Sequence, residues 1–265
     1  MTRWQVTLMF AVLLVTTPGY PQTPEHRISA PMSFFDDADV MPPGTVNLSS
    51  DFSYGSVDAG HDLAFPGGTI TVGLNRRMHL TGSTGYVRSV FEEVGVNGIG
   101  DTYVGLKFVV FMEGKRRPAL AVKPSLEVLG DPSVVGNPLA PGRANFLIPV
   151  TVQKSFDTWR VYYTTGYLTR GIVFHSLAWE WNGWSRLTPV VVLSHGRLTR
   201  DQDFIAQLGL NRSRSDILAG VGIGLGRNWG AYWNFSRSFG RSDPNSLRYQ
   251  ISAGLGYTFR FWGKP

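Results

Sequence analysis

The sequence of 265 residues contains no cysteine. This absence excludes disulfide bonds, thiolate metal sites and a cysteine nucleophile, and it fits an oxidising compartment where a free thiol is a hazard. Charged residues are scarce, at 17% against about 25% in a typical soluble domain. After residue 15, no apolar run approaches the roughly 18–20 residues of a membrane-spanning helix. Together these features argue against a helical membrane protein, a coiled coil and a disordered chain.

Glycine and aromatic residues are abundant instead. The chain has 31 glycines, and 13% of its residues are aromatic, a composition that favours an all-β protein. The net charge is +6, but the 25 lysines and arginines are scattered, and their longest cluster is Lys115-Arg116-Arg117. Scattered cations do not make a surface that follows a phosphate backbone, so we expect no nucleic-acid partner.

The first residues have the pattern of an export signal. Arg3 precedes an apolar stretch from Val6 to Val15, which is too short to span a bilayer, and Thr16-Thr17-Pro18-Gly19 ends it. We therefore predict a signal peptide over residues 1–19. The N-terminal segment over residues 20–44 is predicted to lie in the periplasm or to enter the lumen in part.

From Pro43 onward, the chain repeats segments of about ten residues in which polarity alternates, each followed by a turn. In the last segment every second residue from Leu247 to Phe261 is apolar, and the residues between them are polar or small. Side chains alternate between the two faces of a strand, so this segment has one apolar and one polar face. The pattern predicts twelve strands, at 45–56, 68–75, 77–90, 99–112, 118–129, 144–154, 158–168, 171–181, 186–199, 214–226, 229–238 and 246–261.

The connections alternate in length. Most of those at one end are short, and longer loops are predicted at 57–67, 91–98, 130–143, 200–213 and 239–245. Outer-membrane barrels combine an even number of strands with tight periplasmic turns and longer outer loops. A soluble sandwich or lipocalin-like barrel would also alternate, so alternation alone does not decide between them.

Aromatic residues favour the membrane barrel. They gather near the predicted short turns and the C-terminus, at Phe111, Phe156, Trp159, Trp181, Trp184, Trp229, Phe261 and Trp262. Such rings prefer the membrane interface, where one part is apolar and one edge stays wet. We therefore predict a closed antiparallel transmembrane β-barrel over residues 45–262, in a Gram-negative outer membrane, with the apolar face toward lipid and the polar face toward the lumen.

Eight charged residues have the parity of the lumen: Asp101, Lys107, Lys123, Glu127, Arg160, Glu180, Arg248 and Arg260. They could form a charged constriction that binds or filters a solute, or a set of salt bridges that fills a narrow barrel; the sequence leaves both open. Lys107 and Lys123 should lie close across a hairpin. Because five of the eight are cations, we expect a mild preference for anionic or polar solutes.

Glycines at Gly220, Gly222, Gly224 and Gly226 follow every second position of one predicted strand. This spacing differs from that of a nucleotide-binding loop, and no helix follows. The glycines would clear side chains from part of the lumen wall, either as an open path or as room for bulky residues such as Tyr162 and Tyr232.

A barrel hydrolase is the enzymatic alternative. His175-Ser176 and Ser194-His195 are adjacent pairs, and adjacent strand residues point to opposite faces, so neither can form a nucleophile–base dyad. The five histidines, at 26, 61, 79, 175 and 195, show no metal-ligand spacing. We therefore expect no catalytic residue, no metal and no cofactor.

Three segments resemble a known family. Gly98-Ile99-Gly100-Asp101-Thr102-Tyr103-Val104-Gly105-Leu106-Lys107 resembles the G-x-G-D-hydrophobic-G-L-K-like strand of the outer-membrane family named for the meta-pathway of phenol degradation. Residues 38–45 resemble the start of those barrels, and residues 256–261 resemble the aromatic last strand that the outer-membrane assembly machinery recognises. The resemblance implies a transporter-like barrel for small, hydrophobic or aromatic compounds.

These observations predict a monomeric barrel for passive passage of a small solute, with Lys107, Lys123, Arg160, Arg248 and Arg260 setting the electrostatics of the lumen. The alternative is a sealed barrel that acts through loops 130–143 and 200–213. In the second loop, Arg212 and Arg214 could meet anionic lipopolysaccharide. Membrane lipid, lipopolysaccharide and the assembly machinery are the other expected partners.

Overall fold

The computed structural model describes residues 35–58, 60–91, 94–134, 142–207, 210–226, 228–240 and 246–262. The predicted signal peptide over 1–19 and residues 20–34 of the N-terminal segment lie outside this part of the chain.

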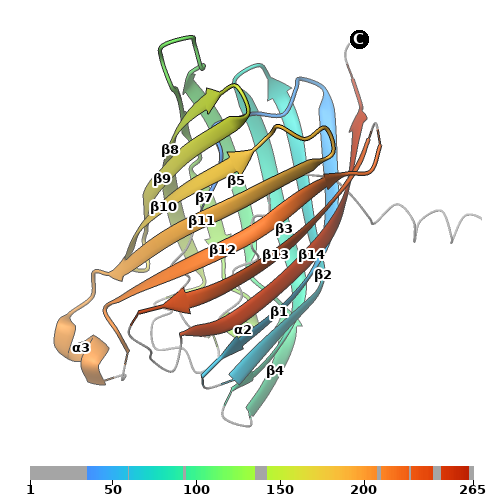
Figure 1. Cartoon of the computed structure of the whole chain (residues 1–265). Coiled ribbons are helices and arrows are strands. Elements are labelled where there is room, and N and C mark those ends of the chain that lie inside the picture. Colours follow the sequence, from blue (N-terminus) through green and yellow to red (C-terminus); the bar gives the residue numbers. More distant parts are fainter. Residues whose placement is uncertain are drawn as a thin grey trace, which may run out of the picture.

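The described strands form one closed antiparallel sheet (Figure 1). The sheet follows the order of the chain and closes where β3 pairs with β5 and β1 pairs with β14. Its strands are β1 (Thr45–Val57), β2 (Gly60–Asn75), β3 (Met78–Phe91), β4 (Val94–Ile99), β5 (Thr102–Phe111), β6 (Ala119–Val122), β7 (Ser125–Val128), β8 (Ala144–Phe156), β9 (Trp159–Leu168), β10 (Ile172–Trp181), β11 (Leu187–Leu198), β12 (Ser213–Gly224), β13 (Trp229–Phe239) and β14 (Leu247–Arg260).

Two barrel strands are interrupted. β4 and β5 both pair with β3 and are separated by Gly100-Asp101. β6 and β7 both pair with β5 and β8 and are separated by Lys123-Pro124, where proline has no N–H for the ladder. When each interrupted pair is taken as one strand, the barrel has twelve strands, which confirms the prediction.

The predictions of long loops at 57–67 and 91–98 are wrong. β2 begins at Gly60, and β4 spans Val94–Ile99. Both segments are rich in glycine, and Pro66 also suggested a turn. In the structure, β2 pairs with β1 and β3 on either side, and the register shifts near Pro66. Glycine here marks a strand that other groups approach closely.

Two short helices lie in the longer loops at the end of the barrel away from the C-terminus (Figure 1). They are α2 (Asp131–Val134) and α3 (Gln202–Gln207). Ile205 of α3 packs on Leu147, Leu168, Ile172, Phe174 and Leu198. No helix of the described chain is long and apolar enough to span a membrane.

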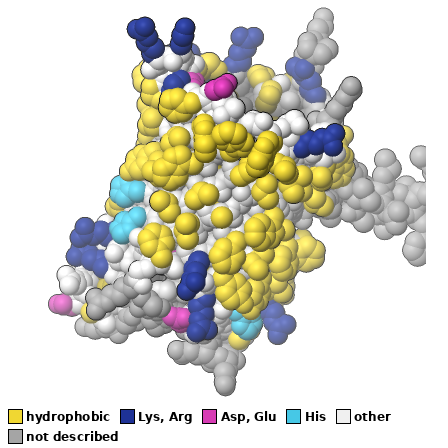
Figure 2. All heavy atoms as spheres, in the orientation of Figure 1, with side chains coloured by type: hydrophobic (Ala, Val, Ile, Leu, Met, Phe, Trp, Pro, Cys, Tyr) yellow, Lys and Arg dark blue, Asp and Glu magenta, His cyan; other side chains and the backbone are white. Residues whose placement is uncertain are grey.

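The outer surface of the barrel carries a wide band of hydrophobic side chains (Figure 2). Along β14, Ile251 and Leu255 are exposed, whereas Gln250 and Ser252, on either side of Ile251, are buried. Aromatic rings gather near the short turns, with the Trp159 and Trp181 ring centroids 4.6 Å apart. The apolar residues of each strand thus face outward, as predicted. A surface of this kind suits hydrocarbon rather than water.

We predict that Leu255→Arg, a change in the apolar band, lowers the free energy of unfolding from lipid vesicles by about 2–4 kcal/mol, because it puts a charge into hydrocarbon. The control Leu225→Arg changes an exposed leucine beside a short turn and should cost at most about 1 kcal/mol near the interface. Equal losses for the two variants in urea titrations would contradict the assigned membrane depth.

Candidate functional site

The chain before β1 enters the lumen. The Ala38 N–H donates to Gln153 Oε1 on β8 at 2.8 Å, and the Met41 N–H donates to His79 Nδ1 on β3 at 3.2 Å. The segment then leaves along β2, where the Gly44 N–H donates to the Gly73 carbonyl at 2.9 Å. Of the two placements expected for residues 20–44, the described residues 35–41 follow the second, inside the barrel.

Phe35 lies on an apolar patch of the inner wall. Its ring packs against side chains from four neighbouring strands, β9 to β12: Tyr162, Ala178, Val190, Val192 and Leu218. A ring buried in this way anchors the segment by removing apolar area from water.

Three aspartates of the segment pair with the cations of the wall. Lys107 Nζ donates to Asp36 Oδ1 at 2.8 Å and to Asp37 Oδ1 at 3.0 Å, and it also reaches the carbonyl oxygens of Asp37 and Asp39. Lys123 Nζ lies 3.2 Å from the other oxygen of Asp36. Lys107 and Lys123 thus lie close together, as expected, and one carboxylate bridges them.

Arg160 continues this network on β9. Its guanidinium pairs with Asp39 and donates to Glu180 Oε2 at 2.7 Å, while Asp37 lies 3.8 Å away. A buried ion pair is costly to break, because the remaining charge is left without compensation. The network therefore holds the segment against β5, the junction of β6 and β7, β9 and β10. We name Asp36, Asp37, Asp39, Lys107, Lys123, Arg160 and Glu180 the lumen ion network.

Asp101 and Glu127 lie in a separate group near α2. Asp101 Oδ1 accepts from the Gly130 N–H at 3.0 Å. Glu127 Oε1 accepts from Arg170 at 3.0 Å and from the Tyr103 hydroxyl at 2.7 Å. Arg170 is among the most deeply buried side chains, and the sequence prediction missed it because it lies in a turn.

The last two predicted residues lie at the rims. Arg248 is 2.8 Å from Asp58, and its side chain is 65% exposed. Arg260 is exposed at the other end of the same strand. The eight predicted residues therefore do not form one ring. Lys107, Lys123, Arg160 and Glu180 come together, Asp101 and Glu127 lie apart from them, and Arg248 and Arg260 are separate.

The excess of cations that the sequence suggested is absent from the described interior. Five cations are buried there, Lys107, Lys123, Arg160, Arg170 and Arg214, against six carboxylates, Asp37, Asp51, Asp101, Glu127, Glu180 and Asp216. The prediction overlooked Asp36, Asp37 and Asp39 because they precede the first strand. The sequence signal for these aspartates was the acidic run Asp36-Asp37-Ala38-Asp39, because the predicted lumen residues included more cations than anions.

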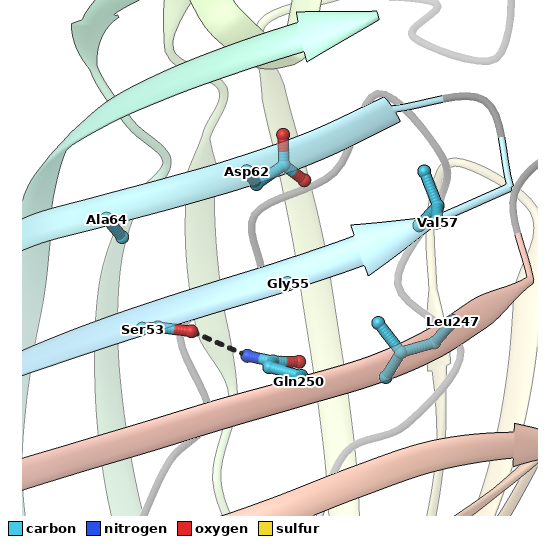
Figure 3. Close-up of a pocket in the computed structure, with 7 residues that line it drawn as sticks. All are labelled: Ser53, Gly55, Val57, Asp62, Ala64, Leu247 and Gln250. Atoms are coloured by element: carbon cyan, nitrogen blue, oxygen red, sulfur yellow. Dashed lines mark hydrogen bonds between the residues drawn. The ribbon is translucent and has the colours of Figure 1, made fainter.

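The opposite wall, from β13 through β14 and β1 to β2, is lined by small and polar residues. The ring of Tyr232 lies over Gly254, and Asn234 lies over Gly220. At these positions, glycine makes room for a larger neighbour, which is the second of the two roles expected for the glycines. A pocket on this wall is shown in Figure 3, where Gln250 Nε2 donates to Ser53 Oγ at 2.8 Å and Asp62 lies nearby on β2.

The histidine–serine pairs are split as the strand geometry requires. His175 and His195 are exposed outside, and Ser176 and Ser194 are buried inside. The sequence analysis missed a cross-strand pair: His195 Nδ1 lies 2.9 Å from Ser215 Oγ on β12. In the described chain no carboxylate is seen to orient the other ring nitrogen, which a catalytic triad needs. The described residues also hold no group of three ligands suited to a metal.

Comparison with known proteins finds similar structures. No family model matches the chain, and no curated protein matches it. The COG4313 outer membrane channel from Pseudomonas putida F1 matches with a TM-score of 0.65 and 11% identity over 86% of this chain and 100% of that one. The NanC porin has a TM-score of 0.55 and 6% identity over 79% and 98% of the two chains. The KdgM porin has a TM-score of 0.50 and 11% identity over 80% and 99%.

At such identities, the likeness concerns the fold, and it extends over nearly the whole length of each similar chain. It supports the barrel class of the resemblance, while membership of the phenol-degradation family is not confirmed. The chain thus shares the closed β-barrel fold of these outer-membrane proteins and carries an apolar band on its outer surface.

We predict that the lumen ion network shields residues 35–41 from solvent reagents. The chain has no cysteine, so Ala38→Cys, at a position 2% exposed, would carry the only thiol. It should react slowly with a water-soluble maleimide and at least about tenfold faster after Asp36→Asn with Asp37→Asn, because these changes remove the partners of Lys107. Glu113→Gln, which breaks an ion pair with Lys154 at a turn, is the control. Rapid labelling without the Asn changes would show that the segment is not held.

Proposed function

We propose that the barrel lets a small solute diffuse across the outer membrane along the wall formed by β13, β14, β1 and β2. The observation that carries the proposal is the one-sided position of the N-terminal segment. The contacts of residues 35–39 lie on β5 to β12. The wall across the barrel from them is lined by groups that offer hydrogen bonds or little bulk: Asn47, Ser53, Gly67, Asn234, Gln250, Ser252 and Gly254.

Passage through such a lumen depends on hydrogen bonds that can be exchanged for water. Hydroxyl and amide groups provide them, so the route favours a small polar solute. The resemblance to the phenol-degradation family favours a hydrophobic or aromatic solute instead. The patch of Phe35, Tyr162, Val190, Val192 and Leu218 inside the lumen supports that candidate.

A sealed barrel is the second candidate function, and the lumen ion network favours it. Several buried ion pairs fix the segment inside the barrel, as a permanent plug would require. Loops 130–143 and 200–213 would then carry the activity through surface contacts.

Planar-bilayer recordings distinguish the two. We predict steady unit conductance from the purified full chain, and at least about a twofold increase after Asp36→Asn with Asp37→Asn, because the released segment no longer narrows the lumen. Glu113→Gln should leave the conductance unchanged. Silence from all three proteins would contradict passage and favour the sealed barrel.

For the lipopolysaccharide contact, the structure overturns one of the two predicted residues. Arg214 is buried and pairs with Asp216 at 3.0 Å, so it faces inward. We propose instead an outer patch formed by Arg197, Arg237, His175 and His195, which are exposed on β10, β11 and β13. His175 pairs with His195 across the strands. Exposed Arg212 lies in the adjoining loop.

The outer patch suits the phosphate groups of a lipid in the outer leaflet. Arginine pairs bidentately with phosphate. The histidine rings are held through Nδ1, by Tyr163 and Thr165 for His175 and by Ser215 for His195. The Nε2 atoms are then left to donate. At the other end, the aromatic last strand, over residues 256–261, is the proposed signal for the assembly machinery.

We predict that Arg197→Gln with Arg237→Gln reduces the phosphorylated glycolipid that copurifies with the barrel at least about fivefold, because two charge-assisted contacts are lost. The control is Arg116→Gln with Arg117→Gln, an equal loss of charge at a short turn. Native mass spectrometry counts the bound lipid. Unchanged retention would contradict the outer patch.

The proposal assigns no catalytic residue. A lipid-hydrolysis assay of the purified barrel tests this point, and turnover that Ser215→Ala abolishes would contradict it.

A further inference from the structure

We infer that Asp51 and Tyr232 form a binding subsite for small cations on the lumen wall. The inference rests on the proposed passage of solute and adds a class of solute to it, namely monovalent metal cations and small organic ammonium ions. Neither residue belongs to the lumen ion network or to the charged residues predicted from the sequence.

The two residues lie at one level of the barrel. Strand pairing aligns six inward positions in a single row. They come from β3, β2, β1, β14, β13 and β12 in this order: Gly85, Gly67, Asp51, Gly254, Tyr232 and Gly222. Four of the six are glycines. Asp51 and Tyr232 are therefore the two residues of this row whose side chains contain heavy atoms.

Glycine is required on either side of Asp51. A Cβ atom on Gly67 would lie 2.6 Å from Cγ of Asp51, and a Cβ atom on Gly254 would lie 2.7 Å from Cζ of Tyr232. Both distances are too short for non-bonded carbon atoms. The carboxylate thus lies along the wall over β2, and the phenol leans over β14 toward β1. Asp51 thus presents an acceptor, and Tyr232 an aromatic ring, on either side of the Gly254 position.

Within the described chain, the Asp51 carboxylate has an oxygen without a partner. The residue is 8% exposed, and its Oδ1 atom has no hydrogen bond. Other buried carboxylates, such as Asp37, Glu127 and Glu180, pair with a cationic side chain, and no ion pair of Asp51 is found in the described chain. A buried carboxylate without compensation is costly, so a cation arriving from the lumen supplies what the protein does not.

The buried cations of the described chain near the lumen are engaged elsewhere. Lys107, Lys123 and Arg160 bind the aspartates of the N-terminal segment. On the neighbouring strand β12, Arg214 pairs with Asp216, and Arg248 at the rim of β14 pairs with Asp58. His79 accepts from the Met41 N–H, so its ring is a neutral acceptor there. In the described chain, none of these cations pairs with Asp51.

The pocket of Figure 3 lies between the rim and this subsite. Along β1, Val57, Gly55 and Ser53 line the pocket of Figure 3, and Asp51 is the next inward position. Asp62, at the same pocket, adds a second carboxylate nearer the rim. A cation would exchange part of its water for Ser53 and Gln250, then for Asp51, while the Tyr232 ring offers its face.

Reversal potentials across a planar bilayer test the subsite with the full chain in a gradient of potassium chloride. We expect wild type to prefer K⁺ over Cl⁻, and Asp51→Asn to reduce the permeability ratio about fivefold, because the isosteric change removes only the charge. Tyr232→Phe should reduce the preference for tetramethylammonium over Cl⁻ less than Asp51→Asn does, since it keeps the aromatic ring. The matched control is Asp203→Asn on α3, an equal change of charge on an exposed loop helix.

The outcomes separate the two proposals. A ratio lowered by Asp51→Asn and kept by Asp203→Asn supports the subsite. Steady conductance with the same ratio in wild type and Asp51→Asn overturns the subsite and leaves passage intact. Absence of conductance in every protein overturns passage and, with it, the subsite.

Discussion

The architecture depends on one constraint, which is that a backbone in hydrocarbon must pair its N–H and C=O groups with itself. A sheet satisfies this only when it closes, and the pairing of β1 with β14 closes this one. Closure then divides every strand into an outer and an inner row. Apolar residues such as Leu255 occupy the outer row, and polar ones such as Ser252 occupy the inner row.

A second constraint acts inside the barrel, where charges have less water around them than at a surface. Lys107, Lys123 and Arg160 need partners there, and residues 36–39 bring them from outside the sheet. The segment thus neutralises one half of the wall. The other half has no contact with residues 36–39 in the described structure, and there one oxygen of Asp51 is buried without a hydrogen bond. This asymmetry links the position of the segment to the proposed route.

Parity made much of the fold predictable from the sequence. Strands such as β1 and β14 agree with their predicted limits to within one residue at each end, because their alternation is regular. β2 was cut short, since Gly60, Pro66 and Gly67 suggest turns when the sequence is considered alone. Only the structure shows that Gly67 is needed under the Asp51 carboxylate.

The site was less predictable than the fold. Parity indicated that Lys107, Lys123, Arg160 and Glu180 face inward, but it carries no information on residues outside strands, so Asp36 and Asp37 were missed. Cross-strand neighbours such as His195 and Ser215 depend on register, which alternation does not determine. The inward direction of Arg214 follows from its place on β12, whereas the sequence had suggested a loop contact.

The central claim is that the apolar row faces lipid and the polar row faces water, and labelling along one strand tests it most directly. Single cysteines at positions 249–256 of β14, in a chain without native cysteine, would carry a fluorophore for quenching by a lipid-dissolved agent and by iodide in water. The account predicts quenching from lipid at odd positions and from water at even positions. The reverse phase, or no alternation, would contradict it.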